Sequence, residues 1–149
     1  MTFIDAMTSL WDLNRERTNA LIGEFRDDPE LDELLVWQPD DGRAHIGWQL
    51  MHIAVTEAVI AKERITQGGA NLGDLAERFG RGSVPDGNVP SLDEIVETTR
   101  SITDDELQTI RPGLEPRGWT VQKALQIISW HEAHHHGQAH ITLNLYRNR

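Results

Sequence analysis

Residues 130–140 read WHEAHHHGQAH and contain five of the seven histidines of the chain. We expect this stretch to lie inside a long helix that begins after Thr120, its N-cap, and runs to about Tyr146. Residues four apart on a helix share one face and lie roughly 6 Å apart along the axis. His131 and His135 can therefore point side by side at one divalent metal ion.

An earlier helical run, residues 45–52 (HIGWQLMH), offers a third imidazole. His45 and His52 are seven residues apart, which is roughly 10.5 Å along a helix axis. They cannot both bind one ion whose nitrogen ligands lie at about 2.0–2.1 Å. One of them is a candidate ligand, and the other is at most a pocket residue. Three neutral imidazoles with an open coordination position are typical of a catalytic metal site.

The inward faces of two predicted helices carry polar residues at corresponding positions along the bundle. The predicted last helix has one inward stripe at alternating steps of three and four residues, comprising Ala124, Ile128, His131, His135, Gln138, Thr142 and Leu145. The earlier helix has a similar stripe, comprising His45, Gln49, His52, Thr56 and Val59. Helical bundles often hold metals where facing side chains converge in this way. His131 with His134, and His136 with His140, are rival pairs, but only His131 with His135 lies on the inward stripe.

The remaining sequence predicts an all-α fold. The predicted main helices cover residues 3–25, 43–65, 91 to about 102, and 120 to about 146. Shorter helical turns are predicted at 30–35, 72–79 and 103–106, and residues 111–118 are predicted to be a loop. A glycine-rich connection from residue 68 to 90 separates the second and third main helices. We predict a single domain over residues 1–149, a four-helix bundle with a long crossover between helices 2 and 3.

The amino-acid composition argues against several classes of function. The chain has 24 acidic and 14 basic residues, a net charge of −10, which argues against binding to nucleic acid and to anionic membranes. It has no apolar run long enough to span a bilayer and no sign of a signal peptide, so we expect a cytoplasmic protein. It contains no cysteine, which excludes a disulfide framework and thiolate ligands. Any thiol chemistry would use a thiol from another molecule.

Residues 131–135 also match the H-E-x-x-H pattern of zinc peptidases, in which the glutamate activates a metal-bound water. The extended form of that pattern requires glycine three residues and histidine six residues after the second ligand. This chain has Gln138 and Ile141 at those positions, and no acidic residue follows Glu132. The sequence also predicts no sheet edge to bind a peptide, so the peptidase interpretation is disfavoured.

Residues 46–57 (IGWQLMHIAVTE) and 130–138 (WHEAHHHGQ) resemble the DinB-like superfamily of four-helix-bundle metalloproteins. That family pattern has one histidine on the second helix and an H-x-x-x-H pair followed by Gly-Gln on the last helix. Chain length, helix order and the long crossover also agree, so the resemblance covers nearly the whole chain. It implies that His52, His131 and His135 are the metal ligands, and it selects His52 over His45.

The resemblance implies a divalent metal, usually zinc or nickel, and a small-molecule substrate. Some proteins of the superfamily are transferases that use a low-molecular-weight thiol such as mycothiol or bacillithiol, and many are called metal-dependent hydrolases. The alternative for this chain is a non-catalytic, stress-related bundle that binds a metal or another ligand. Bundles of this kind often pair along a helix face, so the sequence allows a homodimer.

Several further residues are candidates for the surroundings of the metal. His45, Trp48 and Gln49 lie one or two turns before His52 and are expected to line the pocket, together with Gln138 from the last helix.

Glu57 and Glu132 fall off the ligand stripes. We expect solvated or capping carboxylates there, with orientation of a ligand imidazole as the alternative. Arg43 or Arg117 could meet an anionic thiol cofactor.

Overall fold

The computed structural model describes residues 1–40, 42–83, 105 and 107–149, and this part of the chain is helical without a strand. The predicted all-α class is therefore confirmed. The helices are α1 (Phe3–Gly23), α2 (Leu31–Val36), α3 (Ile46–Ala58), the π-helix η1 (Val59–Ile65), α4 (Leu75–Phe79), the 3₁₀-helix η3 (Pro112–Arg117) and α6 (Val121–Arg147). The helix predicted at 91–102, and most of the turn at 103–106, lie outside the described residues. No described helix has the length and apolar character of a membrane span.

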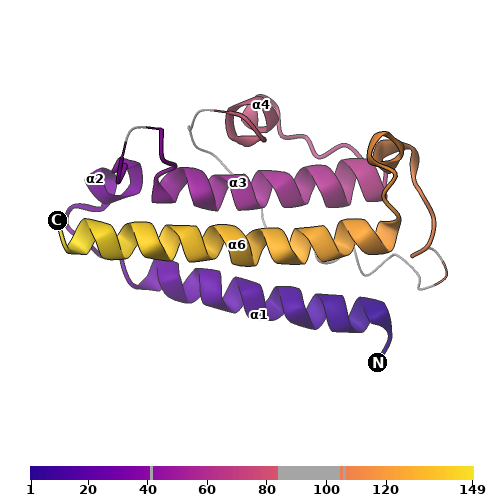
Figure 1. Ribbon diagram of the computed structural model, residues 1–149, viewed down its shortest axis with the longest axis horizontal. Helices are drawn as coiled ribbons and strands as arrows, with labels where there is room; N and C mark the ends of the chain where they lie inside the picture. Colours follow the sequence, from indigo (N-terminus) through magenta and orange to yellow (C-terminus); the bar gives the residue numbers. More distant parts are fainter. Residues whose placement is uncertain (41, 84–104, 106) are drawn as a thin grey trace.

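Three long helices run side by side, with α6 between α1 and α3 (Figure 1). The short α4 lies over α3, and α2 lies beside the C-terminal end of α6. Two apolar clusters hold the helices together. One includes the start of α6 from Val121 to Ile128, and the other includes Ala139 and Leu143 near its end. The histidine-rich stretch occupies the interval between these clusters, so it forms a polar layer within an otherwise apolar interior.

The starts of the helices follow from local capping. The α6 helix begins where predicted, because the hydroxyl of Thr120 accepts a hydrogen bond from the Lys123 amide at 3.2 Å. The α3 helix begins at Ile46, three residues later than predicted. His45 is its N-cap, and the Nδ1 atom of His45 accepts a hydrogen bond from the Trp48 amide at 3.1 Å. His45 therefore stands outside the helix instead of continuing its polar stripe.

The second predicted helix also changes character before its end. After Ala58 the chain continues as the π-helix η1 instead of an α-helix. π-helical segments are rare and are often found at functional sites. The 3₁₀-helix η3, within the predicted loop, packs on η1. A Cβ atom at Gly113 would lie only 2.7 Å from the Cα atom of Arg64, so glycine is needed for this close approach.

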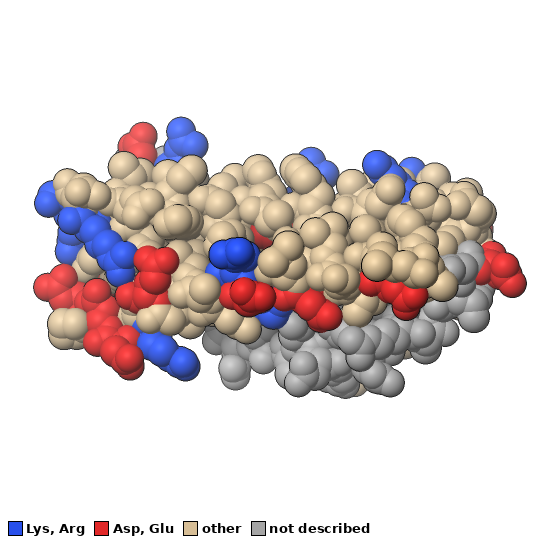
Figure 2. Space-filling model, turned by 90° about the horizontal axis from the view of Figure 1, so that it is seen from below, with Lys and Arg blue, Asp and Glu red and all other residues tan. Residues whose placement is uncertain are grey.

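Charged side chains of both signs gather at the end of the molecule where α2 and the C-terminus lie (Figure 2). Ion pairs there join Arg147 to Glu24 at 3.1 Å and Arg149 to Glu33 at 2.6 Å. Such exposed pairs each contribute only about 0–1 kcal/mol, so the apolar clusters carry most of the stability at this end.

Candidate metal centre

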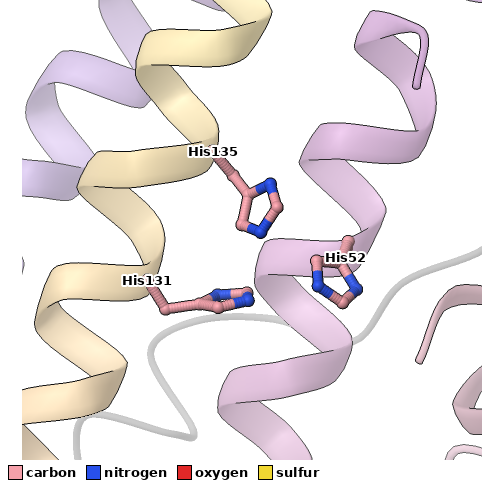
Figure 3. Close-up of side chains that lie close together, drawn as sticks. All are labelled: His52, His131 and His135. Atoms are coloured by element: carbon pink, nitrogen blue, oxygen red, sulfur yellow. The ribbon is translucent and has the colours of Figure 1, made fainter. Parts of the chain in front are cut away.

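One histidine of α3 and two of α6 point into the space between these helices (Figure 3). His52, His131 and His135 each offer a ring nitrogen, and the three nitrogens all lie within 4.8 Å of one another. His52 and His131 are buried and His135 is partly buried. Nitrogens bound to one tetrahedral zinc ion lie about 3.4 Å apart, so the rings need to approach by only an ångström or so. The three predicted ligand residues are thus brought together from two helices.

Protein acceptors orient two of the three rings. The Nδ1 atom of His52 lies 2.5 Å from the carbonyl oxygen of Phe79, and Nδ1 of His135 is hydrogen-bonded to the side-chain oxygen of Gln49. An acceptor at Nδ1 keeps the proton on that nitrogen and leaves Nε2 with its lone pair, as is usual for metal-binding histidines. The Nδ1 atom of His131 is buried without a hydrogen-bond partner in the described part of the chain. This donor set fits a divalent metal that prefers imidazole.

Burial keeps these imidazoles neutral. Burial, with a smaller effect from the neighbouring imidazoles, lowers the pKa of His131 to about 3 and that of His135 to about 4. Burial also lowers the pKa of His52, although its hydrogen bond with Phe79 acts in the opposite direction. All three rings therefore carry free lone pairs at neutral pH, which is the form that binds a metal ion.

A cavity of about 830 Å³ adjoins the three histidines. Its apolar wall includes Val55, Val59, Ile60, Trp119 and Ile127. Charged side chains of Glu63, Arg64, Arg81 and Arg117 also line it. The volume is in the range of small-molecule sites, and the predominantly apolar wall with a few polar groups is typical of them.

The other residues predicted for the pocket lie next to the histidines but line a different cavity. The Trp48 ring stacks on His52 with the ring centroids 4.4 Å apart, and Gln49 holds His135. Gln138 contacts Nε2 of His134 at 3.0 Å. Trp48, Gln49 and Gln138 line a second cavity of about 570 Å³. His45, as the N-cap of α3, lines neither of the two cavities.

The rival histidines lie toward the surface. His134 is exposed and stacks on Trp130, and His140 is exposed. The ring centroids of His136 and His140 are 6.3 Å apart. At the end of the predicted inward stripe, Leu145 is 50% exposed, so the prediction of an inward position was wrong there. The stripe ends at Thr142, because α6 extends past α3 at this end of the molecule.

The prediction of solvated or capping carboxylates at Glu57 and Glu132 was wrong. Both are buried, at 2% and 0% exposure. Arg15 of α1 forms ion pairs with Glu57 at 2.8 Å and with Glu132 at 3.1 Å, and the hydroxyl of Thr18 donates a hydrogen bond to Glu132 at 2.9 Å. Glu132 is thus directed at α1 and is not among the residues lining the larger cavity. This placement also counts against the peptidase interpretation, which needs that carboxylate beside the metal.

Glu57 is held in its protonated form at neutral pH. Burial, together with the neighbouring Glu132, raises the pKa of Glu57 to about 8 against the opposing effect of Arg15. A protonated Glu57 reduces the negative charge that this buried cluster carries beside Arg15. Sequence reasoning missed this cluster because its three members come from three helices far apart in the chain.

Comparison with known proteins gives one match. Residues 10–139 match the family model described as DinB superfamily. This range includes the three clustered histidines. It also includes the buried group of Arg15, Glu57 and Glu132, called here the Arg15 cluster. Among curated proteins and among solved structures, the comparisons found no match.

Proposed function

The chain belongs to the DinB superfamily, and from that premise we propose that it is a metal-dependent enzyme acting on a small molecule. In this proposal His52, His131 and His135 hold one divalent ion, with zinc or nickel the expected metals. The observation that carries the proposal is the set of three neutral imidazoles beside an open cavity, two of them oriented by Phe79 and Gln49.

A divalent ion at such a site supplies Lewis-acid activation of a thiol or a water molecule near neutral pH. The protein's own residues orient the imidazoles, keep them neutral and form the substrate cavity. The acceptors on Nδ1 fix the direction of the His52 and His135 rings, and burial keeps the imidazoles unprotonated. The apolar wall of the cavity limits access of water to the bound substrate. Because the chain has no cysteine, a thiol such as mycothiol or bacillithiol would enter as a second substrate.

The test is metal content measured by elemental analysis on untagged protein after incubation with zinc or nickel. We expect about one ion per chain in the wild type and in His140→Ala, a control on the exposed face of the same helix. His52→Ala and His131→Ala should lose the ion while remaining folded by circular dichroism. A folded wild type that stays metal-free would overturn the proposal. Loaded protein is then assayed for thiol transfer and hydrolysis, and activity that persists in His131→Ala would contradict a role for the metal.

A further inference from the structure

The cavity beside the histidines extends well beyond them. From His52 to Arg64 the chain advances twelve residues along α3 and η1, on the order of 15 Å at the rise of a helix. Both residues line the same cavity. Apolar side chains lie between them along its wall, including Val55, Val59 and Ile60. The cavity therefore suits an elongated ligand with an apolar middle.

Two arginines meet at the far part of this cavity. Arg64 lies in the last turn of η1, and Arg117 ends η3. The close packing of Gly113 on the backbone of Arg64 fixes η3 against η1. Arg117 then lies near enough for its charge to act on Arg64. Burial lowers the pKa of Arg64, and the charge of Arg117 lowers it further. A partly buried arginine and an exposed one, of like charge, thus lie close enough to affect each other.

No carboxylate neutralises this pair within the described part of the chain. Neither Arg64 nor Arg117 forms an ion pair there, although Glu63 is near enough to affect the pKa of Arg64. The guanidinium of Arg117 lies 5.0 Å from the centre of the Trp119 ring, which holds it at the cavity wall. Other arginines do pair with acidic groups, namely Arg15, Arg78, Arg147 and Arg149. Within the described part of the chain, Arg64 and Arg117 thus stand as two neighbouring cations without an ion pair, in a chain of net charge −10.

We infer that Arg64 and Arg117 bind the anionic end of the substrate, whose reactive end lies at the three histidines. The inference rests on the proposed function and names the class of substrate: an elongated organic anion, carboxylate or phosphate, with an apolar middle. Arginine suits this role because its planar guanidinium donates two parallel hydrogen bonds to either anion. Arg81 adds a third cation to the same cavity.

Suberate and octanoate test the inference by calorimetric titration of zinc-loaded protein. Both have eight carbons, but only suberate has a carboxylate at each end, so it can reach the histidines and the arginines together. We expect suberate to bind at least tenfold more tightly than octanoate. Arg64→Gln and Arg117→Gln should each remove most of this advantage, and Arg117→Lys should retain part of it. Arg26→Gln, an exposed arginine on the segment after α1, is the matched control and should leave the advantage intact.

Two outcomes would overturn the inference: equal binding of the two probes by the wild type, or an advantage that survives both glutamine substitutions. If the substitutions lower the urea midpoint and leave the advantage unchanged, the arginines are structural and the inference is also overturned. The zinc-free protein separates this inference from the proposed function. Even without metal, octanoate or octyl phosphate should bind the wild type more tightly than Arg117→Gln, and failure of both anions to do so would refute the anion site alone.

Discussion

The imidazole of His135 depends on the side chain of Gln49 for its direction. His135 is only partly buried and lies on α6, whereas Gln49 is buried on the neighbouring α3. Their hydrogen bond keeps the proton on Nδ1 and turns Nε2 toward the other two rings. His52 is held in the same manner by the carbonyl group of Phe79, which a side-chain substitution cannot remove. Gln49 is therefore the more informative residue to change.

Gln49→Leu keeps the size of the side chain and removes the acceptor. We expect zinc affinity to fall about 10–100-fold, the usual effect of losing a partner that orients a metal-binding histidine. Competition with a chromophoric chelator measures the affinity. Gln126→Leu, the same change at an exposed position of α6, should leave it unchanged. Equal affinity in the wild type and Gln49→Leu would show that the hydrogen bond does not orient a ligand.

Spacing predicted His131 and His135 as a pair, because the four-residue step on α6 is a local property of the helix. Spacing left His45 and His52 as alternatives, and the family resemblance selected His52. Spacing could not distinguish a solvated carboxylate from a buried one at Glu57 or Glu132. Their burial is decided by Arg15 and Thr18, which lie on α1 and are far away in the sequence. Arg117 was named as a candidate to meet an anion, but its proximity to Arg64 was not predicted, since it depends on the packing of η3 against η1.

Among the elements, the Arg15 cluster joins α1 to both helices that carry the histidines. Glu57 lies five residues after His52 on α3, and Glu132 directly follows His131 on α6. A buried ion pair of this type is costly to break, because removal of one partner leaves an uncompensated charge in the interior. The cluster therefore fixes the relative positions of three helices next to the metal-binding face of α6.

Glu57→Gln tests the protonation state of this cluster. The pKa of Glu57 is about 8 in the folded chain and about 4.5 when unfolded, so folding favours the protonated group. Its contribution to stability is complete below about pH 4.5 and is lost as pH rises through about 8. We expect the free energy of unfolding of the wild type to fall relative to Glu57→Gln between pH 5 and pH 9, with near-equal values at pH 5. Urea unfolding in a chelating buffer measures the difference.

Glu16→Gln, at an exposed position on α1, is the control and should show no comparable trend. A wild type that gains stability over Glu57→Gln as pH rises would show that Glu57 is ionised in the folded chain.

Most helix positions could be predicted because they depend on local signals. The start of α6 at the Thr120 cap and the inward periodicity of its first half are such signals. The switch from α3 to the π-helix was not predictable from periodicity, since residues 59–65 also fit an amphipathic α-helix. The delayed start of α3 has a similar cause, because His45 is a rare capping residue and the sequence pattern placed it within the helix.

For the molecule as a whole, the proposed ion would join α3 to α6 between the two apolar clusters. A ligand that binds only the folded chain stabilises it by mass action, by about 4 kcal/mol at a thousand times the dissociation constant. We expect zinc to raise the urea midpoint of the wild type and a chelator to reverse the change. His131→Ala should unfold at the same urea concentration with and without zinc. If zinc also raised the urea midpoint of His131→Ala, the stabilising metal would be bound at another site.

The π-helix η1 has a consequence for how the gene can vary. A π-helix holds an extra residue per turn, as if one codon had been inserted into an α-helix. Loss of one codon between residues 59 and 63 would restore a continuous α-helix and leave the residues after it facing nearly as before, because the π-helix accommodates its extra residue within itself. Arg64 would then keep its direction toward Arg117, and the residues of α3 before it would also stay in register. The cavity could thus tolerate one in-frame deletion in η1 that a regular α-helix could not.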